Sequence, residues 1–305
     1  MRTVLIANPA ARRVESVVPV TQLLEWLGAA GVQAELQVTS AAGDGERLAR
    51  QAVAGGATRV IAAGGDGTLN EVLQALVGTE AELALLPLGT GNVMARSMGL
   101  DERDLRQACQ VAAGGRVKLI DVGRMGGRYF VATAGAGLDA QVTLNLDPRW
   151  KRHLGRLAYF GEFFRTVMLA EPRTFRITAD GEPVSGPMWG VLICNTNEYT
   201  WRMRPFPEAR EDDGLLDAVL IHRTGFLDLI DLTARMFIEG EAAEGHPNAT
   251  VLRVGHLTIA AEPPVPWQVE GDVGGVTPVE VEVVPRSLRL VMAPDGSETK
   301  GGTER

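Results

Sequence analysis

The chain has 305 residues, enough for two domains, and its 45% hydrophobic and 22% charged residues are typical of an ordinary globular protein. Its net charge of −8 excludes the global positive field that recruits nucleic acid, so we expect no nucleic-acid partner. The sequence contains no run of eighteen apolar residues, so no membrane span is predicted. The N-terminal apolar stretch is too short for a secretory signal. Together these two features predict a cytoplasmic protein.

The first part of the chain alternates strand and helix patterns. Its strands are short apolar runs, and its helices carry apolar residues at helical spacing that ends near glycine. The predicted strands are Thr3–Asn8, Ala34–Val38, Arg59–Gly65 and Ala84–Gly89, and the predicted helices follow them at residues 20–31, 46–54, 69–76 and 105–113. Such alternation predicts a mostly parallel sheet covered by helices, which we interpret as a three-layer α/β domain over residues 1–122.

Strand-like runs dominate the chain from about Val122. In order they are RYFVATA, RTFRITA, MWGVLICN, LLDAVLIH, TVLRVGHLTIA, VEVEVV and SLRLVMA. Two helical patterns, Trp150–Leu169 and Phe226–Phe237, interrupt them. Because there are so few helical crossovers, we expect a β-rich, β-sandwich-like domain over residues 123–293, followed by a flexible polar tail over residues 294–305.

Two strand-to-helix turns in the first domain are rich in glycine. In VIAAGGDGTLNEVLQAL a strand ends in two glycines and a helix begins almost at once, which aims backbone N–H groups and the positive helix end at an anion. Asp66 would direct magnesium, and Thr68 would bond phosphate and cap the helix. The alternative is a tight turn with an Asx cap. A second such turn, ALLPLGTGNVMARSMGL, favours a nucleotide crevice.

The pair GGDGTLNEV and PLGTGNVMAR resembles the signature of the diacylglycerol kinase catalytic-domain family, which includes bacterial lipid kinases and sphingosine and ceramide kinases and is more distantly related to NAD kinases. Asn-Pro after the first strand, FVATAGAGLDAQV and EDDGLLDAVLI extend the resemblance over nearly the whole chain. The resemblance implies ATP and Mg²⁺ as cofactors. The implied ATP-binding residues are Asn8, Thr39, Gly64, Gly65, Asp66, Gly67, Thr68, Leu69, Asn70, Glu71 and Thr90.

The chain departs from the family at the first loop. Where the family usually has Ser-Gly after Asn-Pro, this chain has Ala10, Ala11, Arg12 and Arg13. Either the arginines reach phosphate, or they cap the sheet edge in solvent. A different segment, GAGLDA at residues 135–140, matches G-x-G-x-x-A but lacks a clear βαβ setting and a ribose-binding acid about twenty residues on, so we expect no dinucleotide site there.

Two acidic turns lie in the second domain. The family carries Asp-Gly-Glu late in the chain, and its last acid is the proposed base; here the acids are exchanged, as Glu270-Gly271-Asp272. We expect Asp272 to be the catalytic base, with a side chain shorter by about 1.5 Å, whereas the alternative is a charged β-turn. AREDDGLLDAV resembles the family's structural magnesium site, which implies the Asp213 carboxylate and the Arg210 and Leu215 carbonyls as ligands. Its alternative is an ordinary Asp-rich turn.

A basic and aromatic segment begins the first helical pattern of the second domain. It contains Trp150, Lys151, Arg152, His153 and Arg156, and a second such segment contains Tyr199, Trp201, Arg202, Met203, Arg204 and Phe206. Together they are interpreted as a membrane-facing lip. The alternative is an amphipathic helix packed on the sheet with a solvated basic end.

These features predict a lipid kinase that transfers the γ-phosphate of ATP to a lipid hydroxyl. Asp66 and Asp272 are the expected catalytic residues. Diacylglycerol or a related glycerolipid is the expected acceptor, with phosphatidylglycerol or a sphingoid base as alternatives. We expect transient contact with a membrane, at the inner face, and the sequence leaves homodimer formation open. Two rival functions remain: a soluble-substrate kinase of the NAD kinase type and a non-catalytic nucleotide- or lipid-binding module.

Overall fold

The computed structural model describes residues 1–11, 18–89, 91–98, 100–101, 103–146, 156–197, 206–236, 243 and 245–294. The chain divides into two compact units, one formed by Met1–Ile120 with Arg286–Arg305 and the other by Asp121–Pro285. Two long strands, β5 (Arg116–Met125) and β15 (Val279–Met292), contribute residues to both units.

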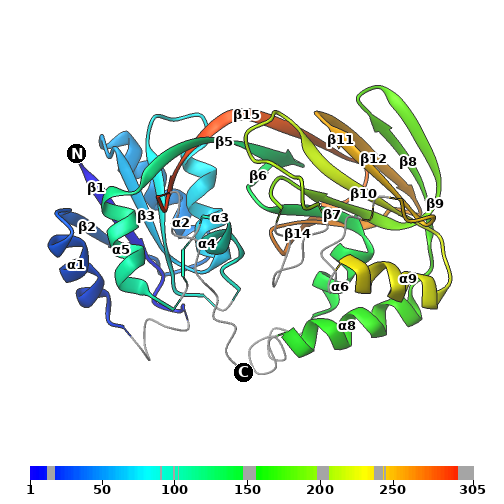
Figure 1. The fold of residues 1–305 in the computed structure, drawn as a ribbon, viewed down its shortest axis with the longest axis horizontal. Coiled ribbons are helices and arrows are strands. Elements are labelled where there is room, and N and C mark those ends of the chain that lie inside the picture. Colours follow the sequence, from blue (N-terminus) through cyan, green and yellow to red (C-terminus); the bar gives the residue numbers. More distant parts are fainter. Residues whose placement is uncertain are drawn as a thin grey trace. The chain divides into compact units, whose positions relative to one another are not determined.

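The first unit is built on a parallel sheet with strand order β15-β4-β3-β1-β2 (Figure 1). Its strands are β1 (Thr3–Ala7), β2 (Ala34–Val38), β3 (Arg59–Gly64) and β4 (Glu82–Pro87), joined by the end of β15. All residues of β1 and β3 are buried. Strands buried on both faces appear in the sequence as continuous apolar runs, and the predicted strands of this unit are therefore confirmed.

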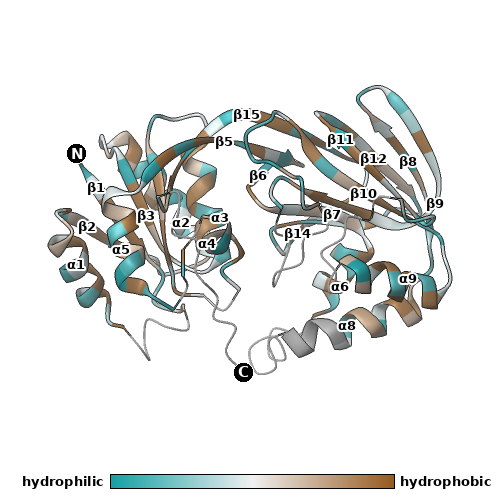
Figure 2. Cartoon of the chain, in the orientation of Figure 1, coloured by the Kyte–Doolittle hydropathy of each residue, from teal (hydrophilic) through white to brown (hydrophobic). Residues whose placement is uncertain are grey.

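Helices cover both faces of this sheet. They are α1 (Val20–Ala29), α2 (Asp44–Ala54), α3 (Asp66–Leu76), α4 (Val93–Ser97) and α5 (Leu105–Gly114). Helix α2 packs on α3, and α1 packs on α5. Hydrophobic residues fill the strands of the sheet, whereas the helices carry both hydrophobic and hydrophilic residues (Figure 2). The three-layer α/β prediction for this part of the chain is confirmed.

The second unit is a β-sandwich-like domain of mainly antiparallel strands, in the order β14-β13-β7-β9-β8-β12-β15, with β10 on β9 and β11 on β10. The strands are β6 (Arg128–Phe130), β7 (Thr133–Gly137), β8 (Arg173–Ala179), β9 (Glu182–Cys194), β10 (Leu216–His222), β11 (Ala249–Val254), β12 (His256–Glu262), β13 (Pro266–Val269) and β14 (Asp272–Val276). The long strand β9 pairs with β8 through its first half and lies between β7 and β10 through its second half. Phe130, Phe175, Leu257 and Trp267 form part of the core that these strands enclose.

Among the described residues of this unit, three helices pack on its sheet. They are α6 (Leu138–Asn145), α8 (Arg156–Leu169) and α9 (Phe226–Ala234). Leu138 of α6, Val167 of α8 and Leu229 of α9 meet in one buried cluster beside Trp189. Among the helices that the structure describes, none is long and apolar enough to cross a membrane.

Several predicted boundaries in the second unit were wrong. RYFVATA, predicted as one strand, is split into β6 and β7, because the N–H groups of Val131 and Ala132 donate to the Glu270 carboxylate instead of a neighbouring strand. Conversely, VEVEVV and SLRLVMA form the single strand β15. Strands β5, β13 and β14 and helix α6 were not predicted. The charged and half-exposed residues of β5 disguise the strand, and α6 shows almost no amphipathic periodicity.

Candidate active site

The two glycine-rich turns of the first unit touch each other backbone to backbone. A Cβ atom added to Gly89 would lie 2.5 Å from the Cα of Gly65, and one added to Gly65 would lie 3.1 Å from the Cα of Gly89. The N–H of Leu88 also donates to the carbonyl of Gly64, at 2.8 Å. Only glycine allows this approach. The turn after β3 and the turn after β4 therefore lie together at one edge of the sheet, as expected for neighbouring parallel strands. Thr90 lies outside the described residues.

The carboxylate of Asp66 lies at the start of α4. Burial raises the pKa of Asp66, while the N–H of Met94 and the guanidinium of Arg96 lower it, as do the N–H groups of residues 92–93. The same carboxylate lies so close to Gly91 that a Cβ added there would be 2.7 Å from its Oδ2. Asp66 therefore holds the second glycine turn to the first through backbone hydrogen bonds, and it places a negative charge where the two turns meet.

The start of α3 differs from those of its neighbours. At the start of α2, the Glu71 carboxylate accepts the N–H groups of Gly43 and Gly45, each at 2.9 Å, and Asp66 occupies the start of α4. Helix α3 instead begins after Gly65, which has no side-chain oxygen to accept the N–H groups of the first turn. This positive helix end, between two glycine turns, fits an anion such as phosphate.

The ends of β1 and β2 bring two polar residues toward this site. Asn8 follows β1, and its Nδ2 donates to the Oγ1 of Thr68 at 3.0 Å, while its Oδ1 accepts the N–H of Ala10. Thr39 follows β2 and is bound through its N–H to the carbonyl of Ala7 at 3.0 Å. The expectation that Thr68 caps α3 was wrong: the N-cap is Gly65, and Thr68 lies inside the first turn with its hydroxyl bonded to Asn8.

The remaining predicted nucleotide residues lie along α3. Gly67 is exposed at its first turn with open space around it, so a ligand can approach there. Leu69 and Asn70 are buried, at 3% and 2% exposure, and Glu71 uses its carboxylate on α2. These three side chains fix α3 in place, and their direct contact with nucleotide stays a prediction. Arg12 and Arg13 lie outside the described residues.

The two exchanged acids of the second unit have different surroundings. The Oε1 of Glu270 accepts the N–H groups of Val131 and Ala132, at 2.9 and 2.7 Å. Asp272 is 58% exposed, and its Oδ2 lies 3.9 Å from a guanidinium nitrogen of Arg128. Glu270 is therefore a structural anchor, whereas the carboxylate of Asp272 is open to a ligand.

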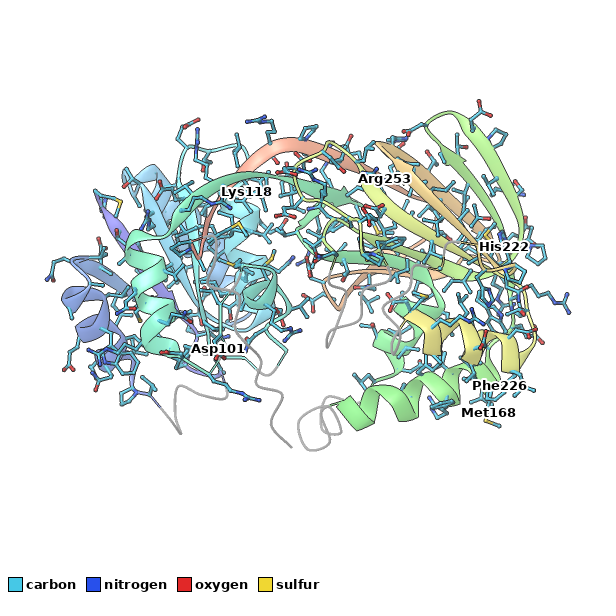
Figure 3. All side chains as sticks on the ribbon, viewed as in Figure 1. Asp101, Lys118, Met168, His222, Phe226 and Arg253 are labelled. Atoms are coloured by element: carbon cyan, nitrogen blue, oxygen red, sulfur yellow. The ribbon has the colours of Figure 1, made fainter. Side chains whose placement is uncertain are left out.

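The predicted metal turn is held by side chains. Asp213 pairs with Arg253 of β11 (labelled in Figure 3), and its Oδ1 accepts the N–H of Leu215 at 3.1 Å. The Nε of Arg253 also lies 3.4 Å from Asp217. The pKa of Asp217 is raised to about 6, mainly by burial and also by the charge of Asp213, while Arg253 opposes the rise. The guanidinium of Arg253 thus faces the carboxylates of both Asp213 and Asp217, and the Asp213 oxygens and the turn carbonyls are of the type that magnesium binds.

The predicted membrane lip lies mostly outside the described residues. Trp150–His153 and Tyr199–Arg204 are not described, and only the backbone of Arg156 is, as the first residue of α8. Phe206 is buried, at 3% exposure, in a cluster with Leu192 and Val219, so its assignment to a membrane-facing surface was wrong. Phe206, which the sequence alone suggested as a surface residue, is instead part of the packing between β9, β10 and α9.

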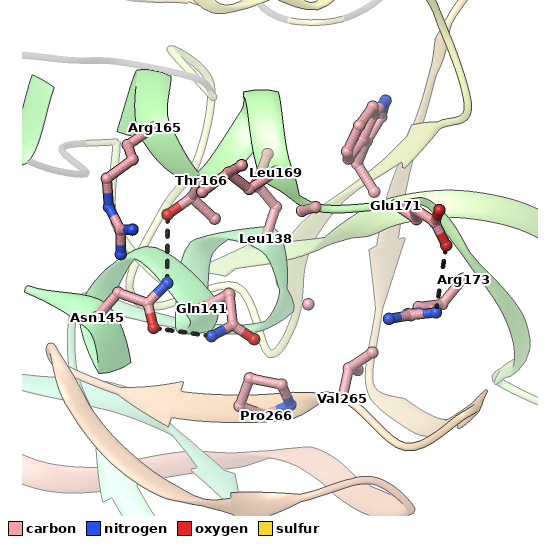
Figure 4. A pocket seen from close by; sticks show the side chains of 13 residues that line it. Leu138, Gln141, Asn145, Arg165, Thr166, Leu169, Glu171, Arg173, Val265 and Pro266 are labelled. Carbon is pink, nitrogen blue, oxygen red and sulfur yellow. Dashed lines mark hydrogen bonds and ion pairs between the residues drawn. The ribbon is translucent and has the colours of Figure 1, made fainter. Parts of the chain in front are cut away.

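The sequence analysis did not foresee a cavity of about 320 Å³ in the second unit (Figure 4). Helices α6 and α8 and the start of β13 enclose it, and its lining mixes apolar side chains such as Leu138, Leu169 and Trp189 with polar ones. On one wall Gln141 donates to Asn145, which lies 3.5 Å from Thr166 of α8. A cavity of this size can hold part of a small ligand. No residue motif marks it, because its walls come from distant parts of the chain.

Comparison with known proteins gives consistent matches over the whole chain. Residues 2–125 match the family model of the diacylglycerol kinase catalytic domain, and residues 132–292 match that of the YegS C-terminal NAD kinase beta sandwich-like domain. The chain is 27% identical to a diacylglycerol kinase of Bacillus subtilis, over 97% of this chain and 98% of that protein. It is 32% identical to a protein of Chromohalobacter salexigens named "Probable lipid kinase YegS-like", over 88% and 86%.

A solved structure confirms the fold. The crystal structure of a diacylglycerol kinase from Bacillus anthracis superposes with a TM-score of 0.78 and 24% identity, covering 96% of this chain and 97% of that one. Both the α/β unit and the β-sandwich-like unit are therefore shared with it.

Proposed function

Because the chain belongs to the family of lipid kinases with a diacylglycerol kinase catalytic domain, we propose that it transfers the γ-phosphate of ATP to a hydroxyl of diacylglycerol or a related glycerolipid. The observation that carries the proposal is the start of α3, where first-turn N–H groups without a side-chain cap lie between two glycine turns in backbone contact. The relatives do not favour the two rival functions, a soluble-substrate kinase of the NAD kinase type and a non-catalytic binding module.

The phosphates of ATP are proposed to bind at the start of α3. Gly67 leaves the backbone open to them, and Asn8 and Thr68 add polar groups near the end of β1. Asp66 supplies a carboxylate oxygen of the kind that Mg²⁺ prefers. The ion, when bound with the nucleotide, would supply charge neutralisation on the transferred phosphoryl group.

Asp272 is proposed to accept the proton of the lipid hydroxyl. Its carboxylate is exposed, while that of Glu270 accepts two backbone N–H groups and is held by them. Although the two acids are exchanged relative to the family, Asp272 therefore still provides an acid at the position where the family has its proposed base.

A phosphorylation assay with radiolabelled ATP tests the proposed function. The acceptors are diacylglycerol, phosphatidylglycerol, a sphingoid base and NAD, and we expect label mainly in diacylglycerol. Label in NAD alone would replace the lipid assignment by a soluble substrate. ATP binding without label in any acceptor would favour the non-catalytic module.

The turn at Asp213 is proposed as a structural magnesium site with the Arg210 and Leu215 carbonyls. We expect Asp213→Ala to lower the thermal midpoint by about 3 °C, because it removes one of the two carboxylate partners of Arg253 and one turn hydrogen bond. We also expect the midpoint of the parent, but not of the variant, to rise with added Mg²⁺. The matched control is Asp212→Ala, which removes the neighbouring carboxylate. Identical midpoints and Mg²⁺ responses of parent and Asp213→Ala would eliminate the site.

Transient contact with a membrane surface is proposed for the second unit. Helices α8 and α9 expose large apolar residues, among them Met168 at 75% and Leu227 at 79% (Met168 is labelled in Figure 3). The basic residues of the sequence segment 150–156, with Arg202 and Arg204, add local positive charge to an acidic protein.

We expect sedimentation with vesicles that contain anionic lipid, weakened as salt screens the charges. Leu227→Asp is expected to weaken this binding about tenfold, since it removes one exposed leucine from the contact. Leu36→Asp, which changes an exposed leucine on β2 of the other unit, is the matched control. Equal sedimentation with neutral and anionic vesicles would contradict the proposal.

A further inference from the structure

Gln268 lies at the centre of a buried hydrogen-bond chain beside the turn that carries Asp272. It is 2% exposed and belongs to β13. Its Nε2 donates to the Oδ2 of Asp139 on α6 at 2.6 Å, and its Oε1 accepts the N–H of Gly271 at 2.7 Å. A buried amide with both ends bonded holds its neighbours in one arrangement. None of the proposed catalytic or nucleotide roles uses this residue.

The turn that Gln268 holds has an unfavourable backbone. Val269 pairs with Asp272 across a two-residue turn, in which Glu270 and Gly271 have φ angles of +52° and +83°. A positive φ at the first position is unfavourable for glutamate, so the turn depends on its surroundings to persist. Side-chain hydrogen bonds hold this turn in place. The Glu270 carboxylate accepts the N–H groups of residues 131–132, and the Gln268 amide oxygen accepts the N–H of Gly271. Asp272 is the next residue, so these contacts fix the backbone from which its carboxylate extends.

Asp139 determines which way the Gln268 amide faces. If the amide were reversed, its NH₂ would meet the N–H of Gly271 and its oxygen would meet the Asp139 carboxylate, and both contacts would be repulsive. Gly135 makes room for this carboxylate, because a Cβ there would lie 2.8 Å from its Oδ2. The segment GAGLDA, which the sequence analysis rejected as a dinucleotide site, thus provides a glycine and an acid that orient Gln268.

We infer that Gln268 is a positioning residue for the kinase reaction: with its amide oriented by Asp139, it fixes the Glu270–Gly271 turn and so the place of Asp272. The inference rests on the proposed role of Asp272 as the base. Misplacement of a reacting group by about 1 Å lowers a rate about 100-fold. A change at Gln268 should therefore lower kcat while leaving the KM for ATP nearly unchanged, because the nucleotide residues belong to the other unit.

The test begins with Gln268→Glu, which keeps the shape of the side chain but sets a second carboxylate against Asp139. We expect kcat with diacylglycerol to fall about 100-fold, with the KM for ATP within about twofold of the parent. Gln268→Met, which removes both hydrogen bonds without adding charge, is expected to behave in the same way. Gln22→Glu is the matched control, because Gln22 also donates to a carboxylate, that of Glu25, but on the surface of α1.

Exchanging the two groups should restore the reaction. In Asp139→Asn with Gln268→Glu, the new amide at position 139 donates to the new carboxylate, whose second oxygen still accepts the N–H of Gly271. We expect kcat to return to within about tenfold of the parent, a coupling that two independent defects would not show. Failure of the exchange to raise kcat above that of Gln268→Glu would overturn the inference.

A second measurement separates positioning from a general loss of structure. If Gln268 acts through Asp272, its substitution has little effect once Asp272 is replaced. The kcat of the double variant Gln268→Glu with Asp272→Asn should therefore lie within about twofold of that of Asp272→Asn alone. An equal further loss in both backgrounds would show a purely structural residue and overturn the inference. Absence of lipid phosphorylation by the parent would instead overturn the proposed function. Full activity of the Gln268 variants beside an inactive Asp272→Asn would overturn only the positioning role.

Discussion

Asp66→Asn is expected to lower lipid-kinase turnover by about 1,000-fold while the protein remains folded. The substitution removes the negative charge at the junction of the two glycine turns, and with it the proposed contact to Mg²⁺. It also weakens the hydrogen bonds that the carboxylate accepts at the start of α4, because only one oxygen remains as an acceptor. The measurement is kcat with diacylglycerol together with the thermal midpoint.

The control for this variant is Asp104→Asn. Asp104 is another aspartate at a helix start in the same unit, where its carboxylate accepts the N–H of Gln107 at 2.9 Å. Asparagine caps helices about as well as aspartate, so activity and midpoint should both stay near those of the parent. If Asp66→Asn keeps turnover within a few-fold of the parent, Asp66 has no catalytic role. If turnover falls only in proportion to unfolded protein, its role is limited to holding α4.

Strands β1 and β3 were predictable because burial on both faces leaves a direct signature. Thr3–Ala7 and Arg59–Gly64 are buried throughout, and each appears as an uninterrupted apolar run that ends in a polar or glycine-rich turn. The position of these turns then follows, since the carboxyl ends of parallel strands lie at one edge of a sheet. The close approach of Gly65 and Gly89 shows that the two turns meet, while their binding of nucleotide stays a prediction.

The hydrogen bonds that complete the site carried no sequence signal. Glu71, expected near nucleotide, binds the start of α2, and Glu270, separated by about 140 residues from Val131, interrupts the strand that the sequence predicted there. The partnership of Gln268 with Asp139 spans 129 residues. A local pattern reports burial and periodicity but not which distant backbone group a side chain reaches, so these contacts required the fold.

The distinction between the two exchanged acids follows from the same contacts. Asp272→Asn is expected to lower turnover about 100-fold or more, with the affinity for ATP within about twofold of the parent, since the loss falls on the reacting hydroxyl. The matched control is Glu262→Gln, which removes another exposed carboxylate of the second unit, one that pairs with Arg176. Its turnover should remain that of the parent.

Glu270→Gln is expected to lower turnover less, by under about tenfold. A glutamine oxygen can still accept the N–H groups of Val131 and Ala132, so the anchor is weakened from a charged to a neutral acceptor and the turn keeps its place. The thermal midpoint should fall slightly, because hydrogen bonds to a charged group contribute more to stability than those to a neutral one.

A larger loss with Glu270→Gln than with Asp272→Asn would move the base to Glu270, whose longer side chain would then have to leave the two N–H groups. Equal and mild losses in both variants, with ATP still bound, would favour the non-catalytic module, so lipid phosphorylation and ATP binding are measured side by side.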